Sequence, residues 1–309
     1  MKALVTGAPG WLGTRLVEIL LERGVEVKCL VFPGADLALL QKMGVGIVIG
    51  DLSRKESLTG ACKGVDVVFH CAGLIHPRRI SDLYSSNVSG TENMLAEAMA
   101  SNVKKFVYVS SNSVAGINVS REKLMDEEDP PRPYMHYGNS KYRAEELVNS
   151  AFRRGDINTS IIRPCWFYGI RQPERQTTFF RMIKKGNPII FGDGRNLRSM
   201  SYIDNVVEAL ILAAEKSASA GGTYWVADEK PYPTLEIYST IAGILGVRDF
   251  KPRFVPSFVS NMCQAADLIL QACGCYIKEI HVAGEMDKDI ACSIDKAKKE
   301  LGYEPKIGL

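Results

Sequence analysis

The glycine-rich turn at residues 7–13 restricts the fold of this chain more than any other stretch. A short apolar run precedes it, and a stretch with helical spacing follows it. That order predicts a strand, a tight turn and a helix. In such a unit Gly7 permits the turn, Gly10 lets the backbone approach a pyrophosphate, and Gly13 lets the helix pack on the strand. Because a helix N-terminus also offers free N–H groups to phosphates, the turn predicts a dinucleotide-binding site.

Strands and helices alternate through the first half of the chain. Apolar runs predict further strands at 25–32, 46–50, 65–73, 105–109 and 160–164. Helical spacing is present at 83–101 and from Tyr137 to about Arg153. Alternation of this kind predicts an α/β fold built on a Rossmann-type doubly wound parallel sheet.

The pattern loosens after residue 165, which predicts a smaller C-terminal substrate domain. We expect the dinucleotide-binding Rossmann domain at 1–164, with 193–227 returning to it. The substrate-binding domain then takes 165–192 and 228–309. Within it, 256–275 has the spacing of an amphipathic helix rich in apolar residues. A lid packed on its own domain is the favoured interpretation of that helix, and contact with a membrane surface is the less favoured one.

Composition excludes several kinds of partner. The 309 residues carry 38 basic and 35 acidic side chains, and a net charge of +3 is too balanced to indicate nucleic-acid binding. No run of about 18 uncharged apolar residues is present, so we expect no transmembrane segment. The first residues lead into a strand rather than a signal peptide. The 8 cysteines form no C-x-x-C pair, which argues against a metal site. We therefore expect a protein of a reducing compartment, the cytoplasm.

The ends of the next strands supply candidate contacts for a dinucleotide. The second strand ends at Phe32, which is neither the acid typical of NAD binding nor the base typical of NADP binding. Asp51 and Leu52 follow the third strand, where the aspartate either accepts the adenine amino group or caps the next helix. Ala72 and Gly73 follow the fourth strand, and such small residues let a flat cofactor lie close to the backbone. The choice between NAD and NADP stays open.

Side chains suited to acid–base chemistry lie later in the chain. Ser110, Ser111 and Ser113 follow the fifth strand, at the edge where open α/β sheets bind ligands, although serines also cap turns. Tyr137 and Lys141 are four residues apart and so share one face of a helix. An ammonium group beside a phenol favours the phenolate and lowers the tyrosine pKa, which suits proton exchange with a substrate oxygen. Chance alone supplies roughly one such spacing in a chain of this composition, so the surrounding strand order makes the pair a candidate site.

Several motifs in a fixed order carry a resemblance to a known family. They are TGAPGWLG at 6–13, Asp51-Leu52, HCAG at 70–73, NVSGTEN at 87–93, VSSNS at 109–113, Tyr137-x-x-x-Lys141, Arg163-Pro164 with Tyr168-Gly169, and Arg198 with Tyr202 and Asp204. In this order and spacing, the chain resembles the extended short-chain dehydrogenase/reductase superfamily, also described as the NAD-dependent epimerase/dehydratase family. The resemblance covers essentially the whole chain.

This resemblance implies a role for each matching residue. Ser111 would hydrogen-bond the substrate oxygen, Tyr137 would act as the acid or base, and Lys141 would bind the nicotinamide ribose and lower the Tyr137 pKa. Hydride would pass between the substrate carbon and the nicotinamide ring of NAD or NADP. The residues expected to bind the cofactor are Gly7, Gly10, Trp11, Leu12, Gly13, Phe32, Asp51, Leu52, Ala72, Gly73, Tyr137, Lys141 and Pro164.

Departures from the family pattern narrow the reaction. Asn112 and Ser113 stand where dehydratases resembling this family carry an Asp-Glu pair, so water elimination is not expected. Trp166 replaces the asparagine with which sugar-nucleotide enzymes contact the diphosphate, and it offers stacking and apolar area instead. Arg198, in contrast, matches a residue with which sugar-nucleotide epimerases hold a phosphate. The stretch at 202–207 is most similar to the 3β-hydroxysteroid dehydrogenase-like branch.

These features favour an NAD(P)-dependent oxidoreductase that acts on a secondary alcohol or ketone with an apolar body. Ser111, Ser113, Trp166 and Arg198 are the expected contacts to this small-molecule substrate. A C4 epimerase of nucleotide sugars, of the UDP-sugar type, is the alternative, and a non-catalytic NAD(P)-sensing protein is a third hypothesis. The resemblance also implies a homodimer formed through the helix at 83–101 and the helix that carries Tyr137.

Overall fold

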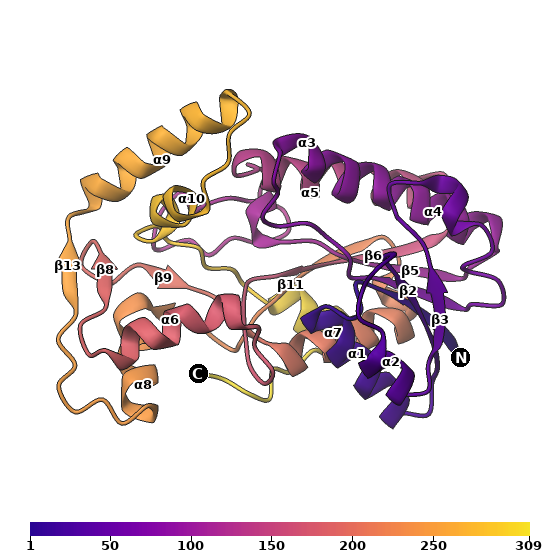
Figure 1. Ribbon diagram of the computed structural model, residues 1–309, viewed down its shortest axis with the longest axis horizontal. Coiled ribbons are helices and arrows are strands. Elements are labelled where there is room, and N and C mark those ends of the chain that lie inside the picture. Colours follow the sequence, from indigo (N-terminus) through magenta and orange to yellow (C-terminus); the bar gives the residue numbers. More distant parts are fainter.

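A seven-stranded parallel sheet forms the centre of the molecule (Figure 1). The computed structural model describes residues 1–309 apart from the side chains at positions 175 and 176. The strands lie in the order β11-β6-β5-β4-β1-β2-β3, and each neighbouring pair is parallel. Their bounds are β1 (Lys2–Thr6), β2 (Glu26–Val31), β3 (Gly46–Ile49), β4 (Val67–His70), β5 (Lys105–Val109), β6 (Asn158–Pro164) and β11 (Gly222–Val226). The predicted doubly wound sheet is confirmed.

Helices cover both faces of this sheet, with α1 and α7 on one side and α4 and α5 on the other (Figure 1). The first face encloses a core that includes Leu16 and Leu210. The second face encloses a core around Phe106 and Ile161. Strands that are buried on both faces have continuous apolar sequences, and for this reason they could be predicted from the sequence. The helix bounds are α1 (Trp11–Glu22), α4 (Gly90–Ala100), α5 (Met135–Arg153) and α7 (Ile203–Glu215).

Short helical segments connect these elements. The α-helical ones are α2 (Ala38–Lys42) and α3 (Ile80–Leu83). The others are 3₁₀ turns at Lys55–Leu58, Asn112–Val114 and Ser217–Ser219, and π-helical turns at Tyr84–Ser89 and Ala297–Leu301. The first π-helical turn joins α3 to α4, so the predicted helix at 83–101 is one helical segment with an irregular start. Across the part of the chain that the structure describes, no helix has the length and apolar character needed to span a bilayer.

The remaining elements form a smaller unit to the left of the sheet in Figure 1. Three two-stranded sheets pair β7 with β10, β9 with β12, and β8 with β13. A third core, around Ile190 and Tyr238 with Trp166 and Phe179 packed against it, lies within this unit. The bounds are β7 (Trp166–Tyr168), α6 (Glu174–Lys184), β8 (Ile189–Phe191), β9 (Leu197–Arg198), β10 (Met200–Tyr202), β12 (Tyr232–Pro233), α8 (Thr234–Ile244), β13 (Arg253–Val255), α9 (Ser257–Ala272) and α10 (Lys278–Glu285).

Several segments from the second half of the chain pack on the main sheet. β11 is its edge strand and α7 covers one of its faces. Ile290, Cys292 and Tyr303 are buried in the same core as β1, although the sequence places them in the substrate-binding domain. The division into two domains therefore stays a prediction.

Helix α9 has an unusual distribution of polar and apolar residues. Ser260, Asp267 and Gln271 are its buried residues, whereas Phe258 and Ile269 are 60% and 66% exposed. The helix packs mainly on α10. An amphipathic helix is present where the sequence predicts one, but its polar side faces the protein.

Candidate active site

A groove of about 820 Å³ lies over the carboxyl ends of β1 to β5. Open parallel sheets bind ligands at this edge because loops from several strands meet there. Of the predicted cofactor contacts, the lining includes Gly7, Gly10, Trp11, Leu12, Gly13, Phe32, Asp51, Leu52, Ala72, Gly73, Tyr137 and Lys141. Pro164, also predicted, is buried at the end of β6 and lies outside the described lining.

The glycine turn has no room for side chains. A Cβ on Gly7, whose φ is +87°, would lie 2.7 Å from the Ala72 nitrogen. A Cβ on Gly10 would lie 2.6 Å from the Gly7 oxygen, and one on Gly13 would lie 2.7 Å from that oxygen. The Gly10 N–H donates to the Gly7 carbonyl at 2.9 Å and closes the turn. The groove is therefore floored by bare backbone and the first N–H groups of α1, which fits the pyrophosphate of a dinucleotide.

The adenosine end of the groove carries little charge selectivity. Phe32 is 63% exposed at the tip of β2. Asp51 lines the groove, but its Oδ1 also accepts hydrogen bonds from the Ser53 N–H at 2.9 Å and the Ser53 hydroxyl at 2.7 Å. These bonds close a turn at Asp51 and do not reach the N–H groups of the next helical segment, whose N-cap is Arg54, so the two roles that the sequence left open for Asp51 stay open. Neither NAD nor NADP is favoured by these contacts.

Lys141 and Tyr137 reach the other end of the groove from α5. Lys141 is buried, its Nζ donates to the Val109 carbonyl at 2.7 Å, and it lies 4.2 Å from the centre of the Tyr108 ring. Burial lowers the pKa of Lys141 to about 7, against the opposing effect of Glu145. The amine is therefore only partly protonated at neutral pH.

The Tyr137 hydroxyl lies beside the Ser111 side chain. Burial raises the pKa of Tyr137 above its usual value, the neighbouring Ser111 lowers it, and Glu285 raises it further. The predicted lowering of the Tyr137 pKa by Lys141 is therefore wrong for the protein alone. The Lys141 amine is bonded to Val109 and its own pKa is depressed, so it places too little charge beside the phenol to offset burial.

Close contacts fix the first turn of α5 against the end of β5. A Cβ on Gly138 would lie 2.3 Å from the Ser113 carbonyl oxygen, and the Tyr134 N–H donates to that oxygen at 2.8 Å. Ser113 also donates its own N–H to the Ser111 hydroxyl at 3.2 Å. The glycine beside Tyr137 thus lets the helix approach the serine segment, a role that the sequence alone did not indicate.

Asn87 connects the same helix to the loop after β4. Its amide oxygen accepts the Leu74 N–H at 2.8 Å. Its amide nitrogen donates to the Leu74 carbonyl at 2.9 Å and to the Ser140 hydroxyl at 3.0 Å. The side chain is buried, so these bonds are shielded from water. Asn87 therefore holds the groove wall and the helix that carries Tyr137 and Lys141 at a fixed distance.

The predicted substrate contacts Trp166 and Arg198 lie in the smaller unit. Trp166 packs on Phe179, with ring centroids 5.1 Å apart. The Arg198 guanidinium donates to the Glu285 backbone carbonyl. Burial lowers the Arg198 pKa, whereas the carboxylates of Glu285 and Asp289 raise it. Acids of the same chain therefore already surround the Arg198 charge.

The structure adds a group of polar residues that sequence reasoning missed. Asp267 and Gln271 lie on α9, and His281 and Glu285 lie on α10. Glu285 raises the pKa of both Tyr137 and Arg198, and its backbone carbonyl accepts a hydrogen bond from Arg198. Each helix carries its pair at i and i+4, a spacing visible in the sequence. That spacing alone did not show which face of either helix is buried.

Comparison with known proteins identifies the family. The family model described as 3-beta hydroxysteroid dehydrogenase/isomerase family matches residues 4–256. The chain belongs to this family. The predicted membership of the extended short-chain dehydrogenase/reductase superfamily, in its 3β-hydroxysteroid dehydrogenase-like branch, is confirmed.

Relatives match nearly the whole chain. A 4-hydroxy-2-methyl-3-oxo-4-farnesyl-3,4-dihydroquinoline-1-oxide ketoreductase from Stigmatella aurantiaca is 29% identical over 99% of this chain and 93% of its own length. A 2-alkyl-3-oxoalkanoate reductase from Stenotrophomonas maltophilia is 28% identical over 100% of this chain and 96% of its own. The crystal structure of gox2253 superposes with a TM-score of 0.82 at 27% identity, covering 98% of this chain and 93% of the other.

The protein is an NAD(P)-dependent oxidoreductase of the extended short-chain type, as predicted. It exchanges hydride between a nicotinamide cofactor and a secondary alcohol or ketone. The alternative of a nucleotide-sugar epimerase is not favoured, because the family model and the relatives are those of dehydrogenases and reductases.

Proposed function

We propose that Ser111, Tyr137 and Lys141 catalyse the NAD(P)H-dependent reduction of a ketone with an apolar body. The observation that carries this proposal is that the Tyr137 hydroxyl, at the inner end of the cofactor groove, lies beside the Ser111 side chain and one helical turn from Lys141. Two hydroxyl groups that meet in this way can both donate to one carbonyl oxygen. The residues that would hold the cofactor are those that line the groove.

Each of the three side chains has a distinct chemical role in this proposal. When bound, the nicotinamide supplies the hydride that reaches the carbonyl carbon. Ser111 and Tyr137 donate hydrogen bonds to the carbonyl oxygen, and Tyr137 gives that oxygen its proton as negative charge develops. The raised Tyr137 pKa keeps the phenol protonated near neutral pH, which suits an acid. Lys141, with a pKa of about 7, can hold or release a proton in the same groove.

Two observations support the proposal that the substrate has an apolar body: the aromatic residues of the smaller unit and the names of the relatives. Trp166 and Phe179, whose rings pack at a tilt, offer aromatic surface rather than phosphate ligands. The two reductases from Stigmatella and Stenotrophomonas are named for 3-oxo compounds that carry farnesyl or alkyl groups. We assign the substrate contacts to Ser111, Ser113, Trp166 and Arg198. A titration with UDP that gave micromolar binding would contradict this substrate class.

A pair of tyrosine variants tests the catalytic assignment. We expect Tyr137→Phe to lower turnover of a 2-alkyl-3-oxo acid by about 10²- to 10⁴-fold, because the substrate oxygen loses its acid. Thermal shifts with NADH and NADPH should change far less than turnover, since the groove keeps its shape. Tyr142→Phe, the same substitution on the same helix, is the control and should retain activity. Unchanged turnover in Tyr137→Phe would show that the assignment is wrong.

We also propose a cytoplasmic homodimer. All 8 cysteines are free thiols. The Cys165 and Cys292 sulfurs lie 3.5 Å apart without a disulfide bond, which fits a reducing compartment. The dimer would pair α4 and α5 of two copies, which are adjacent on one face of the sheet. Light scattering tests this assembly, and a monomeric mass at micromolar concentration would contradict it. Contact with a membrane surface through α9 remains the less favoured proposal.

A further inference from the structure

The helix that carries Tyr137 begins without a cap from its own segment. Tyr134 is the N-cap of α5, and its side chain makes no capping hydrogen bond. Met135 follows with a φ of +51°, an uncommon backbone conformation for a residue with a side chain. The first N–H groups of a helix lack partners within the helix. Tyr137 lies in this first turn, so its position depends on what satisfies those groups.

A side chain from far along the chain supplies one partner. Gln271 of α9 accepts the His136 N–H on its amide oxygen at 3.2 Å, across 135 residues. Its amide nitrogen donates to both carboxylate oxygens of Asp267 at 2.9 Å. Because an ionised carboxylate only accepts hydrogen bonds, Asp267 orients the amide so that its oxygen faces α5. Gln271 is 4% exposed and Asp267 is fully buried, so water does not compete for these groups.

The α10 helix holds Asp267 in place. The His281 Nδ1 hydrogen-bonds the Asp267 carboxylate at 2.7 Å. The His281 ring also lies 5.4 Å from the Tyr134 ring, so the same histidine contacts both the network and the N-cap of α5. A continuous set of buried contacts therefore runs from α10 through α9 to the first turn of α5.

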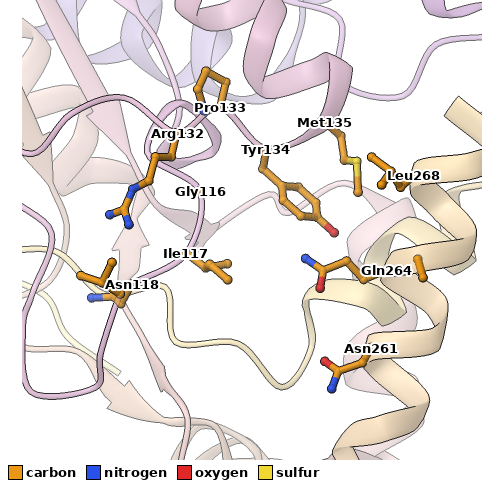
Figure 2. Close-up of a pocket in the computed structure, with 12 residues that line it drawn as sticks. Gly116, Ile117, Asn118, Arg132, Pro133, Tyr134, Met135, Asn261, Gln264 and Leu268 are labelled. Carbon is orange, nitrogen blue, oxygen red and sulfur yellow. The ribbon is translucent and has the colours of Figure 1, made fainter. Parts of the chain in front are cut away.

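Elsewhere α9 stands away from the segment that leads into α5. A pocket of about 690 Å³ separates Asn261, Gln264 and Leu268 of α9 from the chain at 116–119 and 132–135 (Figure 2). The Tyr134 ring extends across this space toward Gln264. The polar contact of Gln271 is therefore a defined attachment point and not one contact within a continuous packed interface.

We propose that Gln271 is a positioning residue for Tyr137: it caps α5 from α9 and so fixes the phenol against Ser111. This inference rests on the proposed role of Tyr137 as the proton donor. Without the amide the His136 N–H loses its acceptor, and of its described partners the buried Asp267 carboxylate keeps only the His281 ring. The first turn of α5 then shifts to find partners, and the phenol moves with it. A catalytic group displaced by about 1 Å can cost about 10²-fold in rate.

Two variants in α9 separate this role from general packing. Gln271→Met keeps the length of the side chain and removes its polar groups. Ser260→Ala is the matched control, because it breaks the Ser260 bond to the Ala283 carbonyl, 2.8 Å long, between α9 and α10 without touching α5. We expect Gln271→Met to lower kcat by about 10- to 100-fold, with the KM for NADPH unchanged and the kcat–pH profile displaced. Ser260→Ala should change neither.

The outcomes distinguish this inference from the proposed function. If Tyr137→Phe is inactive but Gln271→Met matches Ser260→Ala in kcat and pH profile, the positioning role is overturned and the catalytic assignment stands. If Tyr137→Phe is fully active, the proposed function itself fails. Circular dichroism checks folding, and Gln271→Ala, which admits water to Asp267, replaces Gln271→Met if the latter does not fold. Failure of both to fold while Ser260→Ala folds would assign Gln271 to stability and overturn the inference.

Discussion

The absence of a side chain at Gly13 shapes the cofactor groove as directly as any side chain present in it. Its hydrogen points at the Gly7 carbonyl and the Ala8 nitrogen, where a Cβ would be 2.7 Å away from each. Both neighbours are backbone atoms of a closed turn, so they cannot rotate away as a side chain could. An added carbon must displace either the turn or the start of α1, and both of these segments would contact the phosphates of the cofactor.

We therefore expect Gly13→Ala to weaken binding of NAD and NADP by about tenfold or more, equivalent to about 1.4 kcal/mol. The control is Gly243→Ala in α8, where the added Cβ meets nothing within 4 Å. That variant should keep full affinity and gain a little stability, because alanine favours helix over glycine. Isothermal titration with each cofactor measures the effect. Equal affinities in the two variants would contradict the assigned role of the turn.

The sequence predicts residue identities better than residue chemistry. The spacing of Tyr137 and Lys141 placed both on one face of α5, and both line the groove. The direction of the Tyr137 pKa could not be predicted, because it depends on burial and on the Val109 carbonyl that binds Lys141. A four-residue spacing shows neither how deeply the pair is buried nor which carbonyl group binds Lys141. A residue 32 positions away decides where the ammonium points.

At the level of elements, a buried ion pair fixes α5 to the sheet. Arg163 of β6 donates to the two carboxylate oxygens of Glu145 at 2.9 and 2.6 Å. Their side chains are 8% and 2% exposed, and the guanidinium also lies over the Trp225 ring. Glu145 lies one turn beyond Lys141, so the pair anchors the middle of the helix that carries the proposed catalytic residues. A two-bond contact of this kind sets orientation as well as distance.

Breaking this pair from one side should destabilise the fold strongly. We expect Glu145→Gln to cost about 3–5 kcal/mol in the free energy of unfolding, because it removes the carboxylate that is hydrogen-bonded to the buried Arg163 charge. The double variant Glu145→Met/Arg163→Met should recover much of that loss, since it buries no charge. Urea denaturation measures both. A single variant as stable as the wild type would show that Arg163 finds another partner or water.

Element positions were more predictable than the faces that elements bury. The apolar runs of β1, β4 and β5 are continuous because those strands are buried on both sides, and the sequence marks them well. For α9 the spacing predicted an amphipathic helix rich in apolar residues, favoured as a lid packed on its own domain, yet its buried residues are Ser260, Asp267 and Gln271. Two of their partners, His281 and the His136 N–H, come from other elements. Local periodicity cannot show a polar face that is satisfied by long-range contacts.

At the scale of the whole molecule, a buried histidine joins two central strands of the sheet to the helix α4 that covers one of its faces. His70 ends β4, is 1% exposed, and bonds Thr6 on β1 at 2.9 Å and Thr91 on α4 at 3.1 Å. Burial lowers the pKa of His70 to about 3, with a smaller contribution from Lys141. The imidazole is thus neutral in the folded protein, and protonating it places a charge in the core.

This shift gives the stability of the protein a defined dependence on pH. Above about pH 6.5 the imidazole is neutral in both states and its bonds to Thr6 and Thr91 contribute fully. Between pH 6.5 and about 3 the unfolded chain binds a proton that the folded chain does not, so stability falls as the pH falls. At pH 4.5, two units below the unfolded pKa, the loss attributable to His70 should be about 2–3 kcal/mol.

A comparison with His70→Gln isolates the contribution of His70 to the loss of stability at low pH. Glutamine can still bond a threonine hydroxyl on either side but does not titrate, whereas the carboxylates that also protonate in acid are the same in both proteins. We expect the wild type to be the more stable at pH 7.5, and its advantage to shrink by about 2–3 kcal/mol at pH 4.5 in urea denaturation. A difference between the two proteins that stays constant across this range would mean that His70 is protonated in the fold, against its burial between Thr6 and Thr91.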